Sequence, residues 1–428
     1  MAGGPRRCLV FSPGLSGHRE VYARVIAKWL AARGVAVWLA ADLSEAGRLA
    51  TPLLEEMVDV LGVELVDLSG ERDGGAAMTL RELRRLVLRT EAEATVFTEA
   101  DDHMAALAAM AWPGARRIPG RLIGIFLRST NYIYSPADGG APARFGGRWS
   151  LFGRGRQADP RRFHEVLQPQ RRLLATALCL DEHFVATAPP GHAWLPDISS
   201  AFDGNSDERS QPAAEAVVWR RRLEELLAGA GERPLLVYLG TAQRRRGYDR
   251  ILSLALRTGA MVAHCGRLPA DDDEMAGRLR AQLLAAGRLL ELGGPYRSVA
   301  TASATLQAAR CVVLPYRSHL GSSGVMLQAL AAGRPVLVPD EGLMGWRTRS
   351  FDLGETVDVR DDDALAAAFL RLHRRGPQPY ATALASFMKS FSREQVEAAL
   401  SAALGFGGSG ARLPQASVAN RPDTEGGS

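Results

Sequence analysis

Short apolar runs alternate along the chain with longer amphipathic stretches that have helical spacing. The first run, CLVF at residues 8–11, precedes a stretch that ends at Gly34, and a glycine at this point is a common helix stop. Further strand-like runs lie at residues 35–42, 63–69, 94–100, 121–129 and 181–187. Strands that alternate with helices form parallel sheets covered on both faces. The pattern therefore predicts a doubly wound α/β domain in this half of the chain.

The alternation stops at residues 199–215, which are polar, contain Gly and Pro, and are typical of a linker. It resumes with apolar runs at residues 234–240, 261–266, 289–294, 310–316 and 334–340. These runs predict a second parallel sheet. Near the C-terminus, Ser392 and Gln395 have the spacing of a capping box and predict the start of a last helix.

The pattern divides the chain into two domains, as its 428 residues also suggest. We expect a first domain over 1–198, a linker over 199–215, a second domain over 216–388, a closing helix over 389–405 and a disordered tail over 406–428. An apolar content of 46% with 23% charge is typical of a soluble protein. Neither a membrane span nor a signal peptide is predicted, so we expect a cytoplasmic protein.

The four cysteines are far apart in the sequence and show no metal-ligand spacing. Three of them lie in apolar runs, which favours reduced core residues over disulfides. They are Cys8, Cys179, Cys265 and Cys311. No metal site is expected from this pattern.

The net charge of +5 is mild, but positive charge is concentrated in one segment. Residues 114–172 contain 12 Arg against three acidic residues, and the Gly-rich stretch at about 135–160 within them predicts a long loop. This basic loop is either solvated or a surface for an anionic acceptor or an anionic membrane. The second case would place the protein at the inner membrane face. The loop lacks the interleaved aromatic residues of a nucleic-acid module, so no nucleic-acid partner is expected.

Four small residues, Gly321, Ser322, Ser323 and Gly324, precede a short apolar helical stretch that ends at Gly333. The amides in the first turn of a helix lack internal partners and carry partial positive charge. Glycine lets an anion approach the backbone, and serine hydroxyls add donors. The segment therefore predicts a phosphate or diphosphate site, with an ordinary helix cap as the alternative.

A second candidate for phosphate binding follows the apolar run at residues 234–240. Arg244, Arg245 and Arg246 lie in a loop bounded by Gly240 and Gly247. Guanidinium groups bind phosphate through two parallel hydrogen bonds. These arginines are expected to neutralise the same diphosphate, and a solvated basic loop is the alternative.

These segments resemble the C-terminal domain of the retaining nucleotide-sugar glycosyltransferases of the GT-B fold, the group 1 or family 4-like enzymes. The family's loop reads G-R-x4-K-G, and Gly240, Arg246 and Gly247 match its G, K and G, with Arg in place of Lys. Its later motif ends in A-x-A-x-G-x-P-V, which is matched by Ala329, Ala331, Gly333, Pro335 and Val336. The resemblance runs from about Arg7 to Leu404 and is most specific at residues 327–336. It implies two Rossmann-like domains facing a central cleft, with a C-terminal helix that crosses back to the first domain.

The chain departs from the family motif at three positions. Gln328 and Leu320 stand where the family has its two glutamates, and Thr241 replaces the family's Arg. In relatives the second Glu binds ribose hydroxyls, and Gln328 keeps the ability to donate and accept hydrogen bonds. We expect His319, with the two serines that follow, to replace the contacts to the donor sugar that the first Glu makes.

The resemblance also implies a role for residues elsewhere in the chain. His103 matches a histidine that contacts the donor sugar, with a helix-capping role as the alternative. Gly17 lies in the family's N-terminal glycine loop and meets donor or acceptor, unless it only forms a turn. Tyr296 lies where the family places nucleobase contacts.

The expected function is retaining transfer of a sugar from a nucleotide-diphosphate sugar to an unknown acceptor. The catalytic candidates are His103 and Arg246, and no metal or cofactor beyond the donor is expected. The donor-binding candidates are Gly17, Arg244, Arg246, Tyr296, His319, Gly321, Ser322, Ser323, Gly324 and Gln328. The alternatives are a non-catalytic binding or partner subunit, which the missing glutamates suggest, and a sugar phosphorylase or synthase on the same fold.

Overall fold

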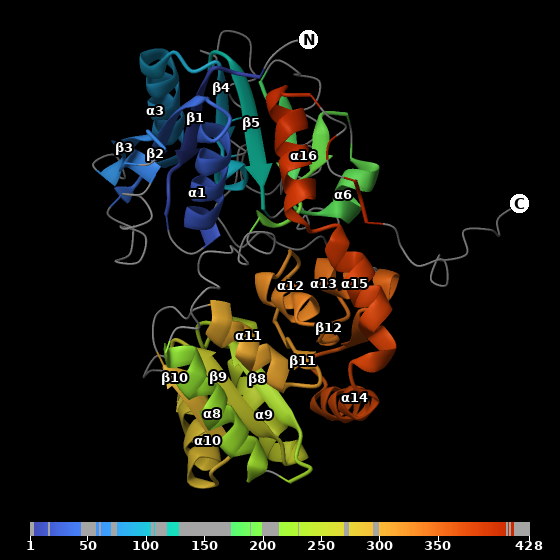
Figure 1. Ribbon diagram of the computed structural model, residues 1–428. Helices are drawn as coiled ribbons and strands as arrows, with labels where there is room; N and C mark the ends of the chain where they lie inside the picture. The colour runs from blue at the N-terminus through green and yellow to red at the C-terminus, as the bar shows by residue number, and fades with distance from the viewer. Residues whose placement is uncertain are drawn as a thin grey trace, which may run out of the picture. The chain divides into compact units, whose positions relative to one another are not determined.

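The chain folds into two compact α/β units, seen in the computed structural model of Figure 1. The first unit comprises Met1–Phe202 and Phe391–Leu413, and the second comprises Asp203–Ser390 and Pro414–Ser428. The structure describes residues 4–15, 18–43, 57–59, 61–69, 75–103, 107, 118–127, 173–188, 190–198, 214–229, 231–268, 274–293, 299–407, 410 and 412–414.

The first unit is built on a seven-stranded sheet with the order β3-β2-β1-β4-β5-β6-β7, and every paired neighbour is parallel. Its strands are β1 (Arg7–Ser12), β2 (Ala36–Ala41), β3 (Glu64–Asp67), β4 (Ala94–Phe97), β5 (Arg121–Phe126), β6 (Thr176–Cys179) and β7 (His192–Trp194). β1 is the third strand of this order and is paired along both edges, with β2 and with β4.

Alternate residues of β1 belong to two separate apolar layers. Cys8 and Val10 pack in the layer that includes α1 (His18–Ala31) and α16 (Arg393–Leu404). Leu9 and Phe11 pack in the layer that includes α3 (Gly75–Thr90). Successive side chains of a strand point to opposite faces, so an unbroken apolar run is what a strand covered on both faces requires.

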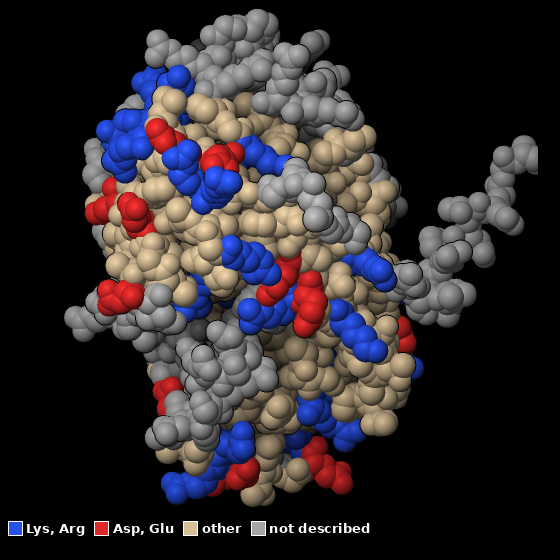
Figure 2. All heavy atoms as spheres, turned by 45° about the horizontal axis from the view of Figure 1, so that its top comes forward, with Lys and Arg blue, Asp and Glu red and all other residues tan. Residues whose placement is uncertain are grey.

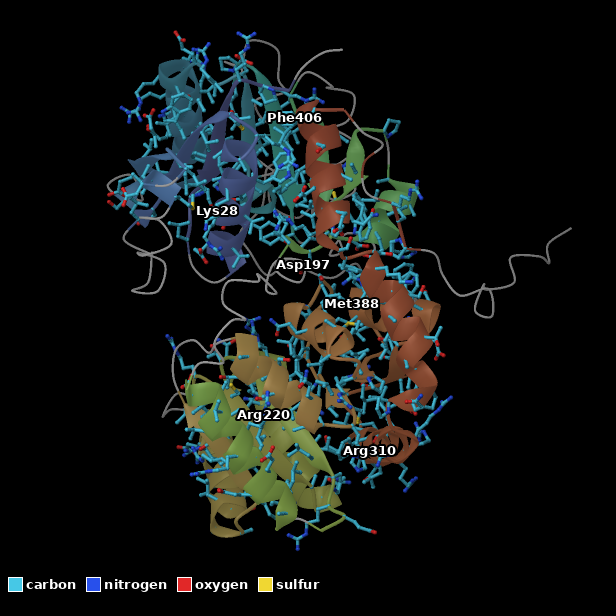
Figure 3. All side chains as sticks on the ribbon, in the orientation of Figure 1. Lys28, Asp197, Arg220, Arg310, Met388 and Phe406 are labelled. Carbon is cyan, nitrogen blue, oxygen red and sulfur yellow. The ribbon has the colours of Figure 1, made fainter. Side chains whose placement is uncertain are left out.

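The last helix of the chain belongs to the first unit, as the family resemblance implied. Val396 and Leu400 of α16 lie in the same apolar layer as α1. An ion pair at 3.0 Å joins Glu397 to Arg33, next to α1. Phe406, labelled in Figure 3, stacks edge-on against Trp29 with ring centroids 5.5 Å apart. The chain therefore returns to complete the core of the domain with which it began.

The second unit contains two three-stranded parallel sheets, ordered β10-β9-β8 and β11-β12-β13, with β8 and β11 in contact. The strands are β8 (Leu235–Leu239), β9 (Met261–Gly266), β10 (Leu289–Gly293), β11 (Val312–Val313), β12 (Val336–Pro339) and β13 (Gly354–Val357). The helices are α8 (Ala214–Ala228), η5 (Arg244–Arg246), α9 (Tyr248–Thr258), α10 (Glu274–Ala285), α11 (Val299–Ala308), α12 (Gly324–Ala331), α13 (Gly342–Phe351), α14 (Asp362–Arg375), η6 (Gln378–Tyr380) and α15 (Ala381–Lys389). The predicted α/β class is confirmed in both units.

Two local predictions are wrong. Residues 181–187 do not form a strand: Asp181 accepts a hydrogen bond from the Phe184 amide at 2.9 Å and caps helix α6 (Glu182–Thr187). A side-chain cap of this kind satisfies an amide that the first turn of a helix leaves unpaired. It therefore favours a helix here, although the run is apolar. Ser392 does occupy the N-cap position of α16, but its side chain makes no cap hydrogen bond, so the capping box is not formed.

Two other expectations concern the cysteines and the linker. All four cysteines are free and buried, as core residues should be. Most of the linker that we expected over 199–215 lies outside the described residues, and α8 already begins at Ala214. Among the residues that the structure describes, no helix is long and apolar enough to cross a membrane.

Candidate functional site

The two segments that the sequence singled out for phosphate binding lie on two loops of the second unit that are in direct contact. One loop, residues 240–247, follows β8, and the other, residues 314–323, follows β11. The Arg317 amide donates to the Arg245 carbonyl at 2.9 Å. Gly247 has a φ of +71°, and a Cβ there would lie 2.3 Å from the Pro315 carbonyl oxygen. Only glycine allows the two loops to approach this closely.

Arg317 joins the two loops through its side chain. Its guanidinium donates to the Arg244 carbonyl at 2.9 Å. It also makes two hydrogen bonds, at 3.0 and 2.6 Å, to the buried carboxylate of Asp249 at the start of α9. A guanidinium in this bidentate geometry is rigid. Arg317 is therefore part of the scaffold of the loops, and the sequence analysis did not identify it.

Arg246 lies against the turn at Gly240. Gly240 has a φ of +95°, and a Cβ on it would lie 3.0 Å from Nη1 of Arg246. Arg246 is half-buried, whereas Arg244 and Arg245 are exposed. Of the three arginines, Arg246 is thus held most closely against the strand end, which agrees with its place in the motif.

The small residues at 321–324 start helix α12. Ser323 is its N-cap and accepts a hydrogen bond from the Met326 amide at 3.3 Å. Gly324 is the first helical residue, and the amides of this first turn are the partial positive end of the helix. Gln328 lies one turn further along α12 and is half-buried. The helix cap and the expected anion site are compatible, because the cap uses the Ser323 hydroxyl and the anion site would use first-turn amides.

His319 stands beside the same turn. A ring nitrogen of His319 lies 3.0 Å from the Ser322 carbonyl oxygen. Burial lowers the pKa of His319, and the positive charges of Arg246 and Arg245 lower it further, against the opposing effect of the Ser322 carbonyl. His319 is therefore neutral at pH 7, and the positive charges of Arg245 and Arg246 act on its ring.

A buried polar network contacts the carbonyl oxygen of Gly240. A ring nitrogen of the fully buried His264 lies 3.1 Å from the Gly240 carbonyl oxygen, and its other ring nitrogen lies 3.7 Å from Glu291. Glu291 also accepts from Arg280 and Tyr248. Burial raises the pKa of Glu291, but His264 and Arg280 outweigh it and bring the pKa down to about 2. The network is charged and fixes the end of β8.

A buried arginine, Arg347 of α13, also reaches the 321–324 turn, and the sequence analysis missed it. Its Nη1 donates to Oγ of Ser322 at 2.9 Å. Arg347 lies after the recognised motif, in a helical stretch, where no spacing rule marks one arginine above another. The burial of Arg347 depends on how α13 packs, so the sequence alone gave no signal for it.

The remaining candidates lie in the first unit or outside the described residues. His103 closes η3 (Ala100–His103), is 9% exposed and packs against Phe97 with ring centroids 5.0 Å apart. It therefore does not belong to the unit that holds Arg246. Gly17, Tyr296 and the basic loop at about 135–160 lie outside the described residues. In the described part of the chain, no cluster of three or more His, Cys, Asp or Glu could hold a metal ion.

Solved structures that resemble this chain were found, and the matches extend over nearly its whole length. HepE of Anabaena, solved in complex with UDP, matches with a TM-score of 0.61 and 12% identity over 94% of this chain and 99% of that one. The chain has the GT-B fold. Sucrose-phosphate synthase from Thermosynechococcus elongatus gives 0.56 and 13% over 91% and 96%. WaaG, a glycosyltransferase involved in lipopolysaccharide biosynthesis, gives 0.52 and 15% over 91% and 95%. No protein-family model and no curated protein matches the sequence.

The GT-B fold is thus established by shape at low sequence identity. A fold supports many chemistries, so it does not by itself assign an activity to this chain. The activity must be argued from the loops that follow β8 and β11.

Proposed function

We propose that the chain is a glycosyltransferase whose second unit binds the diphosphate of a nucleotide-sugar donor. The observation that carries the proposal is the contact of the Arg246 loop with the loop that leads into the turn at residues 321–324, made by Gly247 against Pro315. Arginine donors and the positive end of a helix are thereby brought to one place. This is the combination that suits a doubly charged, elongated anion.

The expected chemistry is retaining transfer, in which the departing diphosphate takes the acceptor's proton on the same face of the sugar. No protein nucleophile is needed for this route. The protein's contribution is to stabilise negative charge as the bond to the sugar breaks. Arg246 and the first-turn amides of α12 supply that stabilisation, and losing one such donor costs roughly 3 kcal/mol of activation free energy.

The other parts of the substrates are assigned by the same reasoning. Gln328 hydrogen-bonds the ribose, since it lies one turn beyond the diphosphate amides on α12. His319, which is neutral and stands beside the turn, contacts the donor sugar. We assign acceptor binding to the first unit and propose His103 as its catalytic contribution. An anionic or membrane-associated acceptor would suit the arginine-rich segment at residues 114–172.

The test is a calorimetric titration of the protein with UDP, GDP, dTDP and ADP, followed by Arg246→Ala with the best ligand. We expect one nucleotide to bind and the variant to bind it at least about tenfold more weakly, since a charged hydrogen bond is worth about 1.5–3 kcal/mol. Arg221→Ala is the matched control, because Arg221 also lies in the second unit but has a side chain that is 75% exposed. Unchanged affinity in Arg246→Ala would remove this residue from the site.

Donor hydrolysis separates the enzyme from the non-catalytic alternative. With the matching nucleotide-sugar, slow release of free sugar is expected even without the acceptor, and it should be lost in Arg246→Ala. Binding of the nucleotide without any hydrolysis or transfer would favour a binding subunit that has kept the fold.

A further inference from the structure

Arg347 is the one fully buried arginine among the charged residues that the structure records as buried, with 0% exposure. It lies on α13, 25 residues after Ser322, and its Nη1 donates to the Ser322 hydroxyl oxygen at 2.9 Å. Taking a guanidinium out of water is costly, so its burial beside the candidate diphosphate turn calls for a role.

The backbone of α13 is fixed against the same turn. The Leu343 amide donates to the Leu320 carbonyl at 2.9 Å. Gly342 has a φ of +70°, and a Cβ there would lie 2.9 Å from Cα of Leu320. The start of α13 and the residues before Gly321 therefore touch through their backbones. Arg347 extends from this fixed base, so its guanidinium has little freedom to move relative to Ser322.

The two serine hydroxyls of the turn have different tasks. Ser323 is 5% exposed, and its oxygen caps α12 through the Met326 amide. Its proton is directed to the Tyr316 hydroxyl at 3.5 Å. The Ser322 oxygen accepts from Arg347, and within the described residues its proton has no protein acceptor. Ser322 is only half-buried, so this proton remains available to a ligand.

We propose that Arg347 is a positioning residue that orients and polarises the Ser322 hydroxyl for donation to the donor diphosphate. The inference rests on the proposed function and deepens it. A hydroxyl that accepts a hydrogen bond from a cation becomes a stronger donor, because bonds in a chain polarise one another. Arg347 itself does not touch the ligand. Its charge reaches the diphosphate through Ser322, which keeps the guanidinium shielded from water.

The test is a double-mutant cycle on Arg347→Met and Ser322→Ala, with dissociation constants for UDP and for inorganic pyrophosphate measured by calorimetry. Each single change is expected to weaken both ligands about fivefold, the value of one hydrogen bond. In the Ser322→Ala background, Arg347→Met should change the dissociation constant less than about twofold, because the bond it supports is already gone. Uridine, which has no phosphate, should show none of these losses.

Two further variants keep the cycle interpretable. Arg347→Lys retains the charge but not the fork, and should weaken UDP less than Arg347→Met while leaving the Ser322→Ala protein unaffected; it also replaces Arg347→Met if the latter does not fold. Arg349→Met is the matched control, since Arg349 is an exposed arginine on the same helix, and UDP affinity should not change.

Additive losses in the double variant would show that Arg347 does not act through Ser322, and equal losses for UDP and uridine would show that it acts only on the structure; either result would overturn the inference. These outcomes leave the proposed function standing. If the unmodified protein bound neither pyrophosphate nor any of UDP, GDP, dTDP and ADP, the proposed function itself would fail, and this inference with it.

Discussion

At Gly240, the missing Cβ leaves room for the Arg246 guanidinium. The residue has a φ of +95°, and a Cβ would lie 3.0 Å from the Arg246 guanidinium. Gly240→Ala should therefore both strain the backbone, at about 1–2 kcal/mol, and displace Arg246 from the strand end. We expect lower stability by urea denaturation together with weaker binding of the nucleoside diphosphate.

Gly259→Ala is the control for that experiment. Gly259 also has a positive φ, +75°, but a Cβ there would meet nothing within 4 Å. It should reproduce the loss of stability without the loss of affinity. If both variants bound the nucleotide as tightly as the unmodified protein, Arg246 would not depend on the Gly240 turn.

His319 should make diphosphate binding depend on pH. In the free protein, burial and the arginines lower its pKa below the usual value, so it is neutral at pH 7. A bound diphosphate adds negative charge beside the ring and raises that pKa. Binding should therefore take up a proton, and affinity should rise as the pH falls from about 7 through the pKa of the complex.

The measurement for His319 is calorimetry of nucleotide binding in two buffers of different ionisation enthalpy. His319→Gln should abolish the extra proton uptake, while the titration of the nucleotide itself remains the same in both proteins. Equal proton uptake in the two proteins would place His319 away from the diphosphate.

Sequence spacing singled out the residues of the candidate site that act through local structure. Gly240, Gly247 and Ser323 matter because of a turn or a helix start, and such positions leave a signature in neighbouring residues. Arg317 and Arg347 act across 68 and 25 residues, on Asp249 and Ser322. Their partners are determined by how the strands are ordered in space, which no local pattern records.

At the scale of the element, α12 depends on Ser323 for its start. The hydroxyl accepts from the Met326 amide, so Ser323→Ala should lower the stability of the second unit by about 1 kcal/mol. Urea denaturation followed in the far ultraviolet measures this change. Because the hydroxyl is already used inside the protein, nucleotide affinity should fall less than in Ser322→Ala.

Two substitutions separate the cap from the anion site. Ser323→Asn should restore most of the stability, because Asn is an equally good N-cap residue. Ser323→Asp should also cap the helix, yet weaken the diphosphate by placing a like charge at its binding turn. A stability that is the same in Ser323→Ala and in the unmodified protein would contradict the role of the cap.

The element that the sequence analysis got wrong shows the limit of apolar runs. Residues 181–187 contain the strand-like triplet Phe184, Val185 and Ala186, but Asp181 turns the chain into a helix through one hydrogen bond. Short apolar runs fit a strand or a buried helix equally well, and the flanking cap decides between them. The run of similar length in β9 did form a strand, and all of its residues are buried.

For the whole molecule, the parallel sheets were predictable because their strands are covered on both faces. Such strands are apolar at successive positions, as in β4 and β8, where every residue is buried. Surface charge gave no comparable information. Figure 2 shows acidic and basic side chains interspersed over the described surface of the face it presents, as on most soluble proteins.

The return of the chain to its first domain gives a prediction about independent stability. Leu400 of α16 is 1% exposed and packs in the layer of α1, although the chain up to Ser390 belongs to the second unit. Leu400→Ala should cost the first unit about 2–5 kcal/mol through the lost contacts and the cavity they leave. Hydrogen exchange read by mass spectrometry should show faster exchange in α1 and β1, while amides of β8 and β9 keep their protection.

Nucleotide binding provides the second readout for Leu400→Ala, because the diphosphate loops lie wholly in the second unit. Affinity for the nucleoside diphosphate should be retained at temperatures where the first unit has begun to open, whereas transfer to an acceptor should already be lost. Glu394→Ala is the matched control, since Glu394 is exposed on the same helix and its removal leaves the core intact. If exchange accelerated equally in both units, the two would unfold together, and the last helix would stabilise the molecule as a whole rather than the domain whose core it completes.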